Sequence, residues 1–281
     1  MSNCIWCSPR QCLGPLLFLV YINDLGSFDR ANVKPKLFAD DTNVFVCSKN
    51  ISELNVKSQD VIDKISAWIS ANRLTLNAEK TFYMVFSPKH SNDINLDLNL
   101  FINNSRINRA HFSKFLGVII DDNLSWKFHI QDLCLCLRRY VGIFYKLSLK
   151  LPPNILKMLY FAIIYPRILY GIEIYANTYS CNLHDLMILN NRILRILQHR
   201  NFHTCTLDLY ISYNTLPIDK LFKFQMLIHA HNIFFKAKNL PNILLADRLI
   251  NNEVHDHYTR STFDFHRLSS FSTFGSKLLP R

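Results

Sequence analysis

The stretch that decides the fold is KLFADDTNVFVC, residues 36–47. Runs of strand-forming residues flank the central Ala39-Asp40-Asp41, a pattern that predicts a strand, a tight turn and a second strand. Such a hairpin would present two adjacent carboxylates, Asp40 and Asp41, at its tip. Adjacent carboxylates repel one another, and a divalent cation between them relieves that repulsion. The pair therefore has two interpretations: a site that presents Mg²⁺ to phosphate oxygens, or an ordinary polar turn.

The composition is that of a globular, basic chain. Of its 281 residues, 49% are hydrophobic and 19% charged, which argues against a disordered protein. Lys and Arg number 32 against 21 Asp and Glu, a formal net charge of +11. With aromatic residues interleaved, this surplus favours an RNA or DNA partner over a generic basic protein. No run predicts a membrane span or a signal peptide, so we expect an intracellular chain; no protein partner can be deduced.

The first part of the chain combines helix and strand patterns. Residues 13–25 form an apolar run with a Gly-Pro pair near its start, which predicts a buried helix begun by proline. Ser52 is a candidate N-cap for a second helix, whose apolar residues fall on one face. That helix is expected to end near Asn72.

The middle of the chain predicts strands first and helices later. Residues 83–86 and 115–120 predict strands, whereas the polar residues 87–112 are expected to form a loose hairpin or an insertion. From Trp126 onward, apolar residues recur at helical spacing, and Trp126 itself is expected in the core. We therefore predict an α+β fold, with a mixed unit over residues 1–125 followed by helices.

Several blocks of this sequence, taken in order, resemble the reverse transcriptase of non-LTR retrotransposons, in particular of jockey-type elements. The blocks are residues 13–25 and 38–41, Trp68 with residues 72–77 and 80–81, residues 115–118 with 124–130, and residues 160–166 with Tyr170 and Gly171. The resemblance runs from about residue 8 to about residue 200. It implies a truncated polymerase palm with an Asp-Asp β-hairpin over residues 1–125. A thumb-like helical region would cover residues 126–200, and a C-terminal helical region with a frayed tail residues 201–281.

The resemblance also implies a chemistry: DNA synthesis on an RNA template from deoxynucleoside triphosphates with Mg²⁺. It assigns catalysis and metal binding to Asp40 and Asp41. Lys80 matches a position near the triphosphate of the incoming nucleotide. The alternative for Lys80 is a solvated lysine at a helix–strand junction.

The helix predicted after Trp126 carries the cations Arg138, Arg139 and Lys146. Polymerase thumbs track the nucleic-acid backbone, so these three are candidate nucleic-acid-binding residues. The alternative is an ordinary amphipathic helix with a solvated basic face.

One departure from the family pattern concerns the metal. The family has a third metal-binding Asp on a strand before the Gly14-Pro15 block, and residues 1–13 of this sequence contain neither Asp nor Glu. We therefore expect a polymerase fragment that is inactive alone and binds Mg²⁺ only weakly. The alternatives are a non-catalytic nucleic-acid-binding remnant of a mobile element and an expressed sequence without a role.

Overall fold

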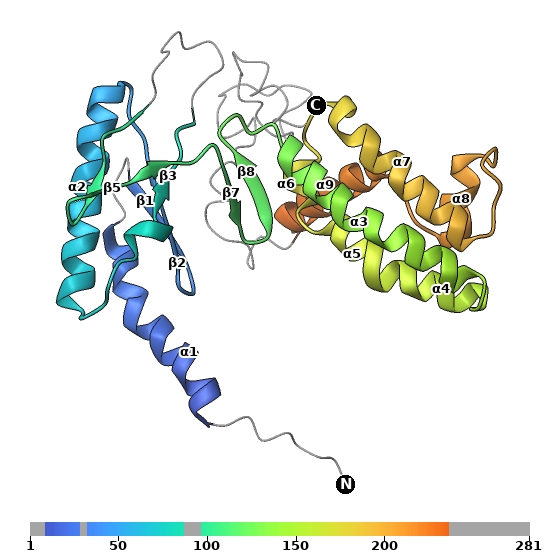
Figure 1. Ribbon diagram of the computed structural model, residues 1–281, viewed down its shortest axis with the longest axis horizontal. Helices are drawn as coiled ribbons and strands as arrows, with labels where there is room; N and C mark the ends of the chain where they lie inside the picture. The colour runs from blue at the N-terminus through green and yellow to red at the C-terminus, as the bar shows by residue number, and fades with distance from the viewer. Residues whose placement is uncertain (1–8, 29–32, 87–96, 236–281) are drawn as a thin grey trace. The chain divides into compact units, whose positions relative to one another are not determined.

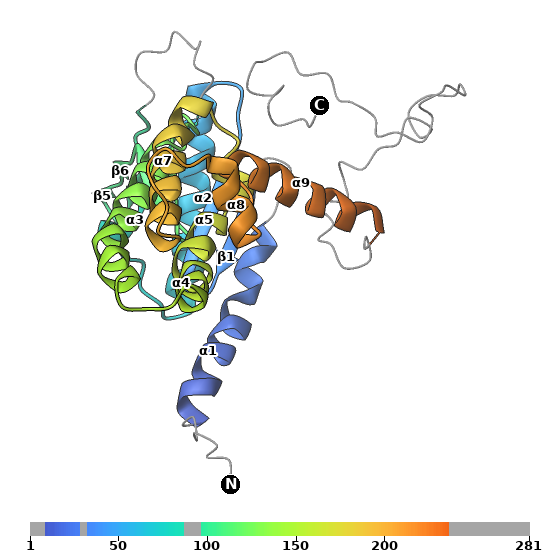
Figure 2. The ribbon, with the colours of Figure 1, turned by 90° about the vertical axis from the view of Figure 1, so that its right-hand side faces the viewer.

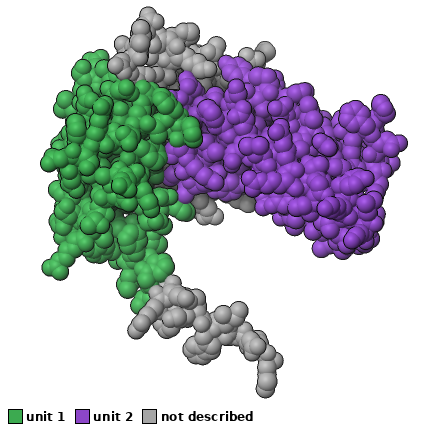
Figure 3. Space-filling view, viewed as in Figure 1, with its two compact units in different colours: residues 1–112 green, residues 113–281 purple. Residues whose placement is uncertain are grey.

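The computed structural model describes residues 9–28, 33–86 and 97–235. The chain packs as two compact units, residues 1–112 and residues 113–281 (Figure 3). The described helices and small two-stranded sheets are compatible with an α+β fold. The boundary between the two units lies between Phe112 and Ser113. The sequence predicts the change from mixed to helical structure later, at residue 125. The division into three regions stays a prediction, and its frayed tail lies outside the described residues.

Unit 1 holds the Asp-Asp hairpin and one long helix. Its elements are α1 (Pro9–Ile22), η1 (Asn23–Phe28), β1 (Val33–Phe38), β2 (Asp41–Val46), α2 (Ile51–Ala71), η2 (Ala78–Lys80), β3 (Phe82–Tyr83), β4 (Phe101–Ile102), β5 (Ser105–Arg106) and β6 (Asn108–Arg109). Strands β1 and β2 pair antiparallel, as do β4 and β5, whereas β3 and β6 run parallel. A small core gathers where α2 meets these short strands, formed by Val85, Leu98, Leu100, Ile102 and Ile107.

Helix α1 contradicts the prediction of a buried helix that begins at the Gly14-Pro15 pair. It begins at Pro9, so Pro15 lies inside the helix, where its missing N–H removes one backbone hydrogen bond. Leu17 is 56% exposed and Val20 is 68% exposed, and Ile22 is the one buried side chain among those described for α1. A helix that is apolar on all sides needs cover on all sides, and the described residues cover only its C-terminal end (Figure 1).

The remaining predictions for unit 1 hold in part. The N-cap of α2 is Asn50 rather than Ser52, while the helix ends at Ala71 beside Asn72, as predicted. The strand predicted over residues 83–86 overlaps β3, which among the described residues covers only Phe82 and Tyr83. Strands β4 and β5 form a short hairpin within the predicted polar segment, of which residues 87–96 lie outside the described part of the chain.

Unit 2 is a helical bundle that follows a short hairpin. Its elements are β7 (Phe112–Phe115, which begins at the unit boundary), β8 (Val118–Asp121), α3 (Lys127–Ser148), α4 (Pro153–Leu159), the π-helix η3 (Tyr160–Ile164), α5 (Tyr165–Leu169), α6 (Ile172–Tyr175), α7 (Ser180–Leu197), α8 (Thr206–Tyr213) and α9 (Ile218–Phe235). Helices α3 and α7 pack side by side, and α8 lies next to α7 (Figures 1 and 2). The π-turn ends at Ile164, two residues before Pro166, whose missing N–H disturbs the helical hydrogen bonding there.

The core of unit 2 confirms the predicted apolar stripes. Leu137 and Phe144 of α3 and Leu186 and Ile193 of α7 are fully buried, and Trp126 is buried with them. The core also holds polar groups that satisfy one another. The Tyr160 hydroxyl donates to Asn190 Oδ1 (3.2 Å), and Asn190 Nδ2 donates to the Tyr210 hydroxyl (3.2 Å). Burial raises the pKa of Tyr210 to about 12, so this phenol stays neutral.

The single strand predicted over residues 115–120 is wrong. The chain turns back at Leu116 and Gly117, both with positive φ, so β7 and β8 form a hairpin. The Tyr170 hydroxyl donates to the Leu116 carbonyl (2.5 Å), and a Cβ on Gly117 would lie 3.2 Å from the Tyr170 ring. Gly171, also at positive φ, would bring a Cβ to 3.1 Å from Val118. Two motifs far apart in the sequence therefore meet, which explains both glycines.

Candidate metal and nucleic-acid sites

The hairpin predicted from the Asp pair is confirmed. Strands β1 and β2 pair over their whole length, and the last pair, Phe38 with Asp41, leaves a two-residue loop of Ala39 and Asp40. Asp40 therefore ends the loop and Asp41 begins β2. Both carboxylates are exposed, and neither takes part in an ion pair within the described residues.

The loop is strained at its first residue. Ala39 has a φ of 50°, in the left-handed region that L-residues with a Cβ avoid at a cost of about 1–2 kcal/mol. Tight hairpin loops favour a positive φ here, and glycine or asparagine usually supplies it. Asp40 and Asp41 follow this residue directly in the turn.

The donor set at the tip fits Mg²⁺ held together with a phosphate, rather than a caged ion. Carboxylate oxygens are the hard ligands that Mg²⁺ prefers, and it commonly takes one or two of them while keeping water and phosphate oxygens. Among the described residues, no group of three or more His, Cys, Asp or Glu side chains could hold a metal. Asp40 and Asp41 would therefore supply at most two protein ligands to the ion, and phosphates and water would supply the others.

Lys80 lies in the same unit, on the short helix η2. Asn77 caps that helix, because its Oδ1 accepts from the Lys80 backbone N–H (3.2 Å) and its carbonyl accepts from the Thr81 hydroxyl (2.8 Å). The Lys80 side chain is exposed. No hydrogen bond or ion pair joins it to Asp40 or Asp41 in the part of the chain that the structure describes, so the structure does not bring the three together.

Two further motif residues of unit 1 do meet. Trp68 Nε1 donates to Asp24 Oδ2 (3.3 Å), and the Tyr21 hydroxyl donates to the Asn72 carbonyl. These contacts join the end of α1 and the start of η1 to the C-terminal end of α2. These residues belong to two separate blocks of the resemblance, and local sequence patterns do not predict that the blocks meet.

The three candidate nucleic-acid-binding cations share the solvent side of α3. Arg138, Arg139 and Lys146 are exposed, and none forms an ion pair among residues 9–28, 33–86 and 97–235. Exposed apolar residues lie among them, including Leu135 (54% exposed) and Tyr145 (60% exposed). The outer side of α3 thus offers cations for phosphates together with apolar surface for sugars and bases.

Two residues that the sequence did not single out as functional fix the start of α3. Asp121 is 2% exposed, and its carboxylate accepts from the backbone N–H groups of Ser125 and Trp126 (both 2.9 Å). His129 is also buried, and its Nδ1 accepts from the Ile119 N–H (3.3 Å). Burial lowers the pKa of His129, which favours the neutral ring. Together they tie hairpin β7–β8 to α3.

The comparisons with known proteins agree with the resemblance seen in the sequence. The chain is 27% identical over 211 residues to the "RNA-directed DNA polymerase from mobile element jockey" of Drosophila melanogaster. This alignment covers 70% of this chain and 22% of that protein. It is 26% identical over 206 residues to the jockey polymerase of Drosophila funebris, with 70% and 22% covered. To the "Probable RNA-directed DNA polymerase from transposon X-element" of Drosophila melanogaster it is 25% identical over 195 residues, with 66% and 21% covered.

This chain is similar to RNA-directed DNA polymerases of mobile elements over 66–72% of its length. It spans about a fifth of the length of these curated relatives. No protein-family model and no solved structure matches the chain. The relationship therefore rests on the sequence alignments, and the position of each site residue rests on the structure of this chain.

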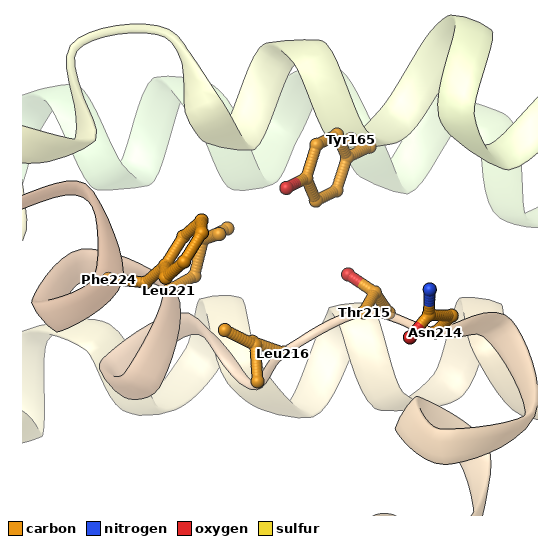
Figure 4. A pocket seen from close by; sticks show the side chains of 6 residues that line it. All are labelled: Tyr165, Asn214, Thr215, Leu216, Leu221 and Phe224. Atoms are coloured by element: carbon orange, nitrogen blue, oxygen red, sulfur yellow. The ribbon is translucent and has the colours of Figure 1, made fainter. Parts of the chain in front are cut away.

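No helix in the described part of the chain is long and apolar enough to cross a membrane. Unit 2 also contains a half-open cavity of about 310 Å³ (Figure 4). Its walls are Tyr165, Asn214, Thr215, Leu216, Leu221 and Phe224. None of the predicted site residues lines this cavity, and the buried Thr215 hydroxyl has no hydrogen-bond partner among the described residues.

Proposed function

We propose that this chain is a fragment of an RNA-directed DNA polymerase from a non-LTR retrotransposon. It would contribute the C-terminal half of the palm and a helical thumb-like region. The observation that supports this most is the hairpin tip, where a strained two-residue loop presents Asp40 and Asp41 side by side in a chain related to such polymerases. The relatives' names describe RNA-directed DNA polymerases, so RNA and DNA are the proposed partners of this fragment.

Each candidate residue then has a physical role. Asp40 and Asp41 would hold Mg²⁺, which supplies positive charge to phosphate oxygens when it is bound. Lys80 would neutralise part of the triphosphate charge as a point charge on a flexible stem. Arg138, Arg139 and Lys146 would contact the backbone phosphates of the bound nucleic acid, without sequence preference.

We propose that residues 1–281 do not extend a primer by themselves. Paired-metal phosphoryl transfer needs ligands on both ions, and two adjacent carboxylates are too few to fix two ions firmly. The second candidate function, a non-catalytic nucleic-acid-binding remnant, draws its support from α3. The outer side of α3 exposes Arg138, Arg139 and Lys146, which need no metal to bind phosphates.

Primer extension tests the catalytic half of the proposal. Purified chain is incubated with a primed RNA template, deoxynucleoside triphosphates and Mg²⁺, next to an Asp40→Ala variant. We expect no extension product from either protein. Extension by the wild type that disappears in Asp40→Ala would overturn the proposed inactivity and leave the polymerase assignment stronger.

A salt titration tests the nucleic-acid half. Binding of a labelled single-stranded RNA is followed by fluorescence anisotropy for wild type, Arg138→Ala/Arg139→Ala, and Lys220→Ala/Lys223→Ala as a control of equal charge on α9. Each lost phosphate contact lowers the log–log salt slope by about 0.7 on single strands. We expect a drop of about 1–1.5 for the arginine pair alone. An equal drop of the slope in the control would mean that net charge, rather than Arg138 and Arg139, sets the salt dependence. Absence of any binding by the wild type would contradict the proposed function.

A further inference from the structure

The half-open cavity of unit 2 has walls that local contacts hold in place. On one side stands Tyr165 of α5, whose ring packs against the rings of Phe161 (5.2 Å between centroids) and Tyr160 (6.3 Å). On the other side the chain leaves α8 through Asn214, which adopts a left-handed conformation with a φ of 52°. Both walls are fixed by contacts within the unit, as the walls of most ligand sites are.

The end of α8 fixes the second wall. The N–H of Asn214 donates to the Ile211 carbonyl, and the N–H of Thr215 donates to the Tyr210 carbonyl (both 3.0 Å). These two hydrogen bonds form the Schellman arrangement that ends many helices, and asparagine tolerates the left-handed conformation that it needs. Thr215 is thereby held with its hydroxyl directed into the cavity, toward which the hydroxyl of Tyr165 also points (Figure 4).

Polar groups line the cavity without partners. The Thr215 hydroxyl is buried, and neither it nor the side chains of Tyr165 and Asn214 form a hydrogen bond with any described residue. Burial raises the pKa of Tyr165, so its phenol is neutral, and no charged side chain of the described residues belongs to the walls. An unpaired buried hydroxyl destabilises a protein, and a ligand that brings a hydrogen-bonding group removes that cost. The walls thus suit a neutral group with both an apolar and a polar part.

The size and the remaining walls point to one aromatic ring. Leu216, Leu221 and Phe224 complete the lining, and the volume of about 310 Å³ lies at the lower end of the range for ligand sites. Tyrosine and tryptophan side chains combine a large apolar ring with one hydrogen-bonding group. Phenylalanine lacks that group, and a charged side chain would lose its hydration here without gaining a charged partner.

The cavity wall continues into an apolar strip on α9. Phe224 is 47% exposed, Leu227 is 67% exposed and Ile228 is 37% exposed, and their spacing places them on one side of the helix. We call these three residues the α9 strip. Lys220 lies one turn before Phe224 and Lys223 one turn before Leu227; both lysines are exposed and form no ion pair in the described part of the chain. A pocket for one aromatic side chain, set in an apolar surface with a charged rim, is the anatomy of a protein interface.

We propose that this cavity anchors an acidic segment of a partner protein by one tyrosine or tryptophan side chain. The ring would pack against Leu221 and Phe224, and its hydroxyl or indole N–H would donate to the Thr215 hydroxyl oxygen. Acidic residues of the same segment would pair with Lys220 and Lys223 at the rim. A nucleic acid suits this face less well, because interfaces with nucleic acids are more polar and more basic than the α9 strip. The inference goes beyond the proposed function, since neither the hairpin tip nor α3 takes part in it.

Peptide selection with the full chain as bait tests the proposal. A random peptide library displayed on phage is depleted on Phe224→Ala and then selected on the wild type. We expect the enriched peptides to share one Tyr or Trp and to carry Asp or Glu beside it. Failure to enrich any peptide, or enrichment of basic peptides or of peptides without an aromatic residue, would overturn the inference.

The Thr215 hydroxyl is tested by fluorescence polarisation with a labelled enriched peptide. Thr215→Val replaces the unpaired hydroxyl by a methyl group and should weaken binding about threefold to tenfold. The free variant should melt at the same temperature as the wild type or higher, because an unpaired buried hydroxyl is removed. A peptide whose Tyr or Trp is replaced by Phe should bind wild type and Thr215→Val equally. Tight binding of the original peptide to Thr215→Val would overturn the proposed anchor.

Matched variants separate the cavity from the rest of unit 2. Lys220→Ala/Lys223→Ala should weaken peptide binding about twofold to fivefold at low salt and less at high salt, as exposed ion pairs do. Arg138→Ala/Arg139→Ala removes the same charge from α3 and should leave peptide binding nearly unchanged. Thr204→Val removes a hydroxyl outside the cavity and serves as the control for Thr215→Val. Equal losses in a variant and its control would overturn the inference.

Two other occupants of the cavity are outcomes that contradict the inference. Displacement of the bound peptide by single-stranded RNA in Arg138→Ala/Arg139→Ala would mean that the cavity accepts a nucleobase. Dimerisation of the wild type that Phe224→Ala abolishes, measured by sedimentation, would mean that a second copy of the chain covers this face. Neither result bears on primer extension or on the salt slope set by α3, so the proposed function is judged separately.

Discussion

Helix α1 of unit 1 and helix α3 of unit 2 are both rich in apolar residues, yet they use them in opposite ways. In α3, Leu137 and Phe144 are fully buried against α7 and its neighbours. In α1, Leu17 and Val20 are mostly exposed, and only the C-terminal end is covered by described residues. Apolar content therefore indicates what a helix needs to contact, and packing decides whether that contact lies within the same unit.

The two hairpins repeat this contrast. The turn of β7–β8 is held by the Tyr170 hydroxyl. Strand β8 is joined to the start of α3 by hydrogen bonds of Asp121 with Trp126 and of His129 with Ile119. The tip of β1–β2 carries the candidate metal ligands, and its carboxylates are exposed. Unit 2 thus buries its apolar residues against one another, whereas in unit 1 the apolar side chains of α1 and the carboxylates of the β1–β2 tip are exposed.

The largest effect is expected from opening the core of unit 2. Phe144→Ala should lower the free energy of unfolding by about 3–5 kcal/mol, because it removes a fully buried ring and leaves a cavity. Urea denaturation followed by circular dichroism measures it. Tyr145→Ala, which removes the neighbouring ring that is 60% exposed, should change stability by less than about 0.5 kcal/mol. Leu17→Ala on α1 should be equally mild, and a loss as large as that of Phe144→Ala would show that α1 is buried in solution.

A smaller loss is expected at the start of α3. Asp121→Ala removes the acceptor of two backbone N–H groups at a buried position and should cost about 2–3 kcal/mol. Asp121→Asn keeps one acceptor oxygen and should cost less. The neighbouring Asp122→Ala serves as the control, since Asp122 is less buried. Equal losses at both positions, measured by the same denaturation, would mean that Asp121 is not what fixes this end of α3.

Protonation of His129 should destabilise unit 2 in mild acid. Burial lowers its pKa in the folded chain, so the unfolded chain, with an ordinary pKa near 6.5, binds the proton more readily. Its contribution to stability is therefore complete above about pH 6.5 and is lost as the pH falls below that value. Asp132 opposes the shift and Lys114 adds to it, both through charge. Melting temperatures between pH 7 and pH 5 should fall less in His129→Gln than in wild type, while exposed His184→Gln should follow the wild type.

The parts of the fold that the sequence predicts correctly are those set by local patterns. The helical spacing of Leu133, Leu137 and Phe144 predicts the buried side of α3, and the strand-forming runs beside Asp40 and Asp41 predict the hairpin. The same locality explains the errors. Residues 115–120 form a continuous apolar run, and nothing within it reveals that the chain reverses at Leu116 and Gly117. The reason lies at Tyr170 and Gly171, which hold the turn from another part of the chain.

The candidate site divides in the same way. The sequence alone places Asp40 and Asp41 at one tip, because their adjacency and the flanking strands fix it. It could not predict the buried carboxylate of Asp121, since that burial depends on tertiary contacts that local spacing does not specify. Lys80 and the basic side of α3 stay predictions about function, because nothing in their surroundings distinguishes a ligand contact from a solvated cation.

The smallest effect is expected at the hairpin tip, and it has the opposite sign. Ala39→Gly relieves a left-handed φ that costs about 1–2 kcal/mol, while the added freedom of glycine in the unfolded chain costs about 0.5–1 kcal/mol. The variant should therefore be more stable than the wild type by about 0.5–1 kcal/mol in chemical denaturation. Ala71→Gly, at the C-terminal end of α2 and without positive φ, should instead lose up to about 1 kcal/mol. If both glycine variants lose stability, Ala39 does not adopt the left-handed conformation in solution. If only Ala39→Gly gains, the turn that carries Asp40 and Asp41 is held under strain, as tips that place functional side chains often are.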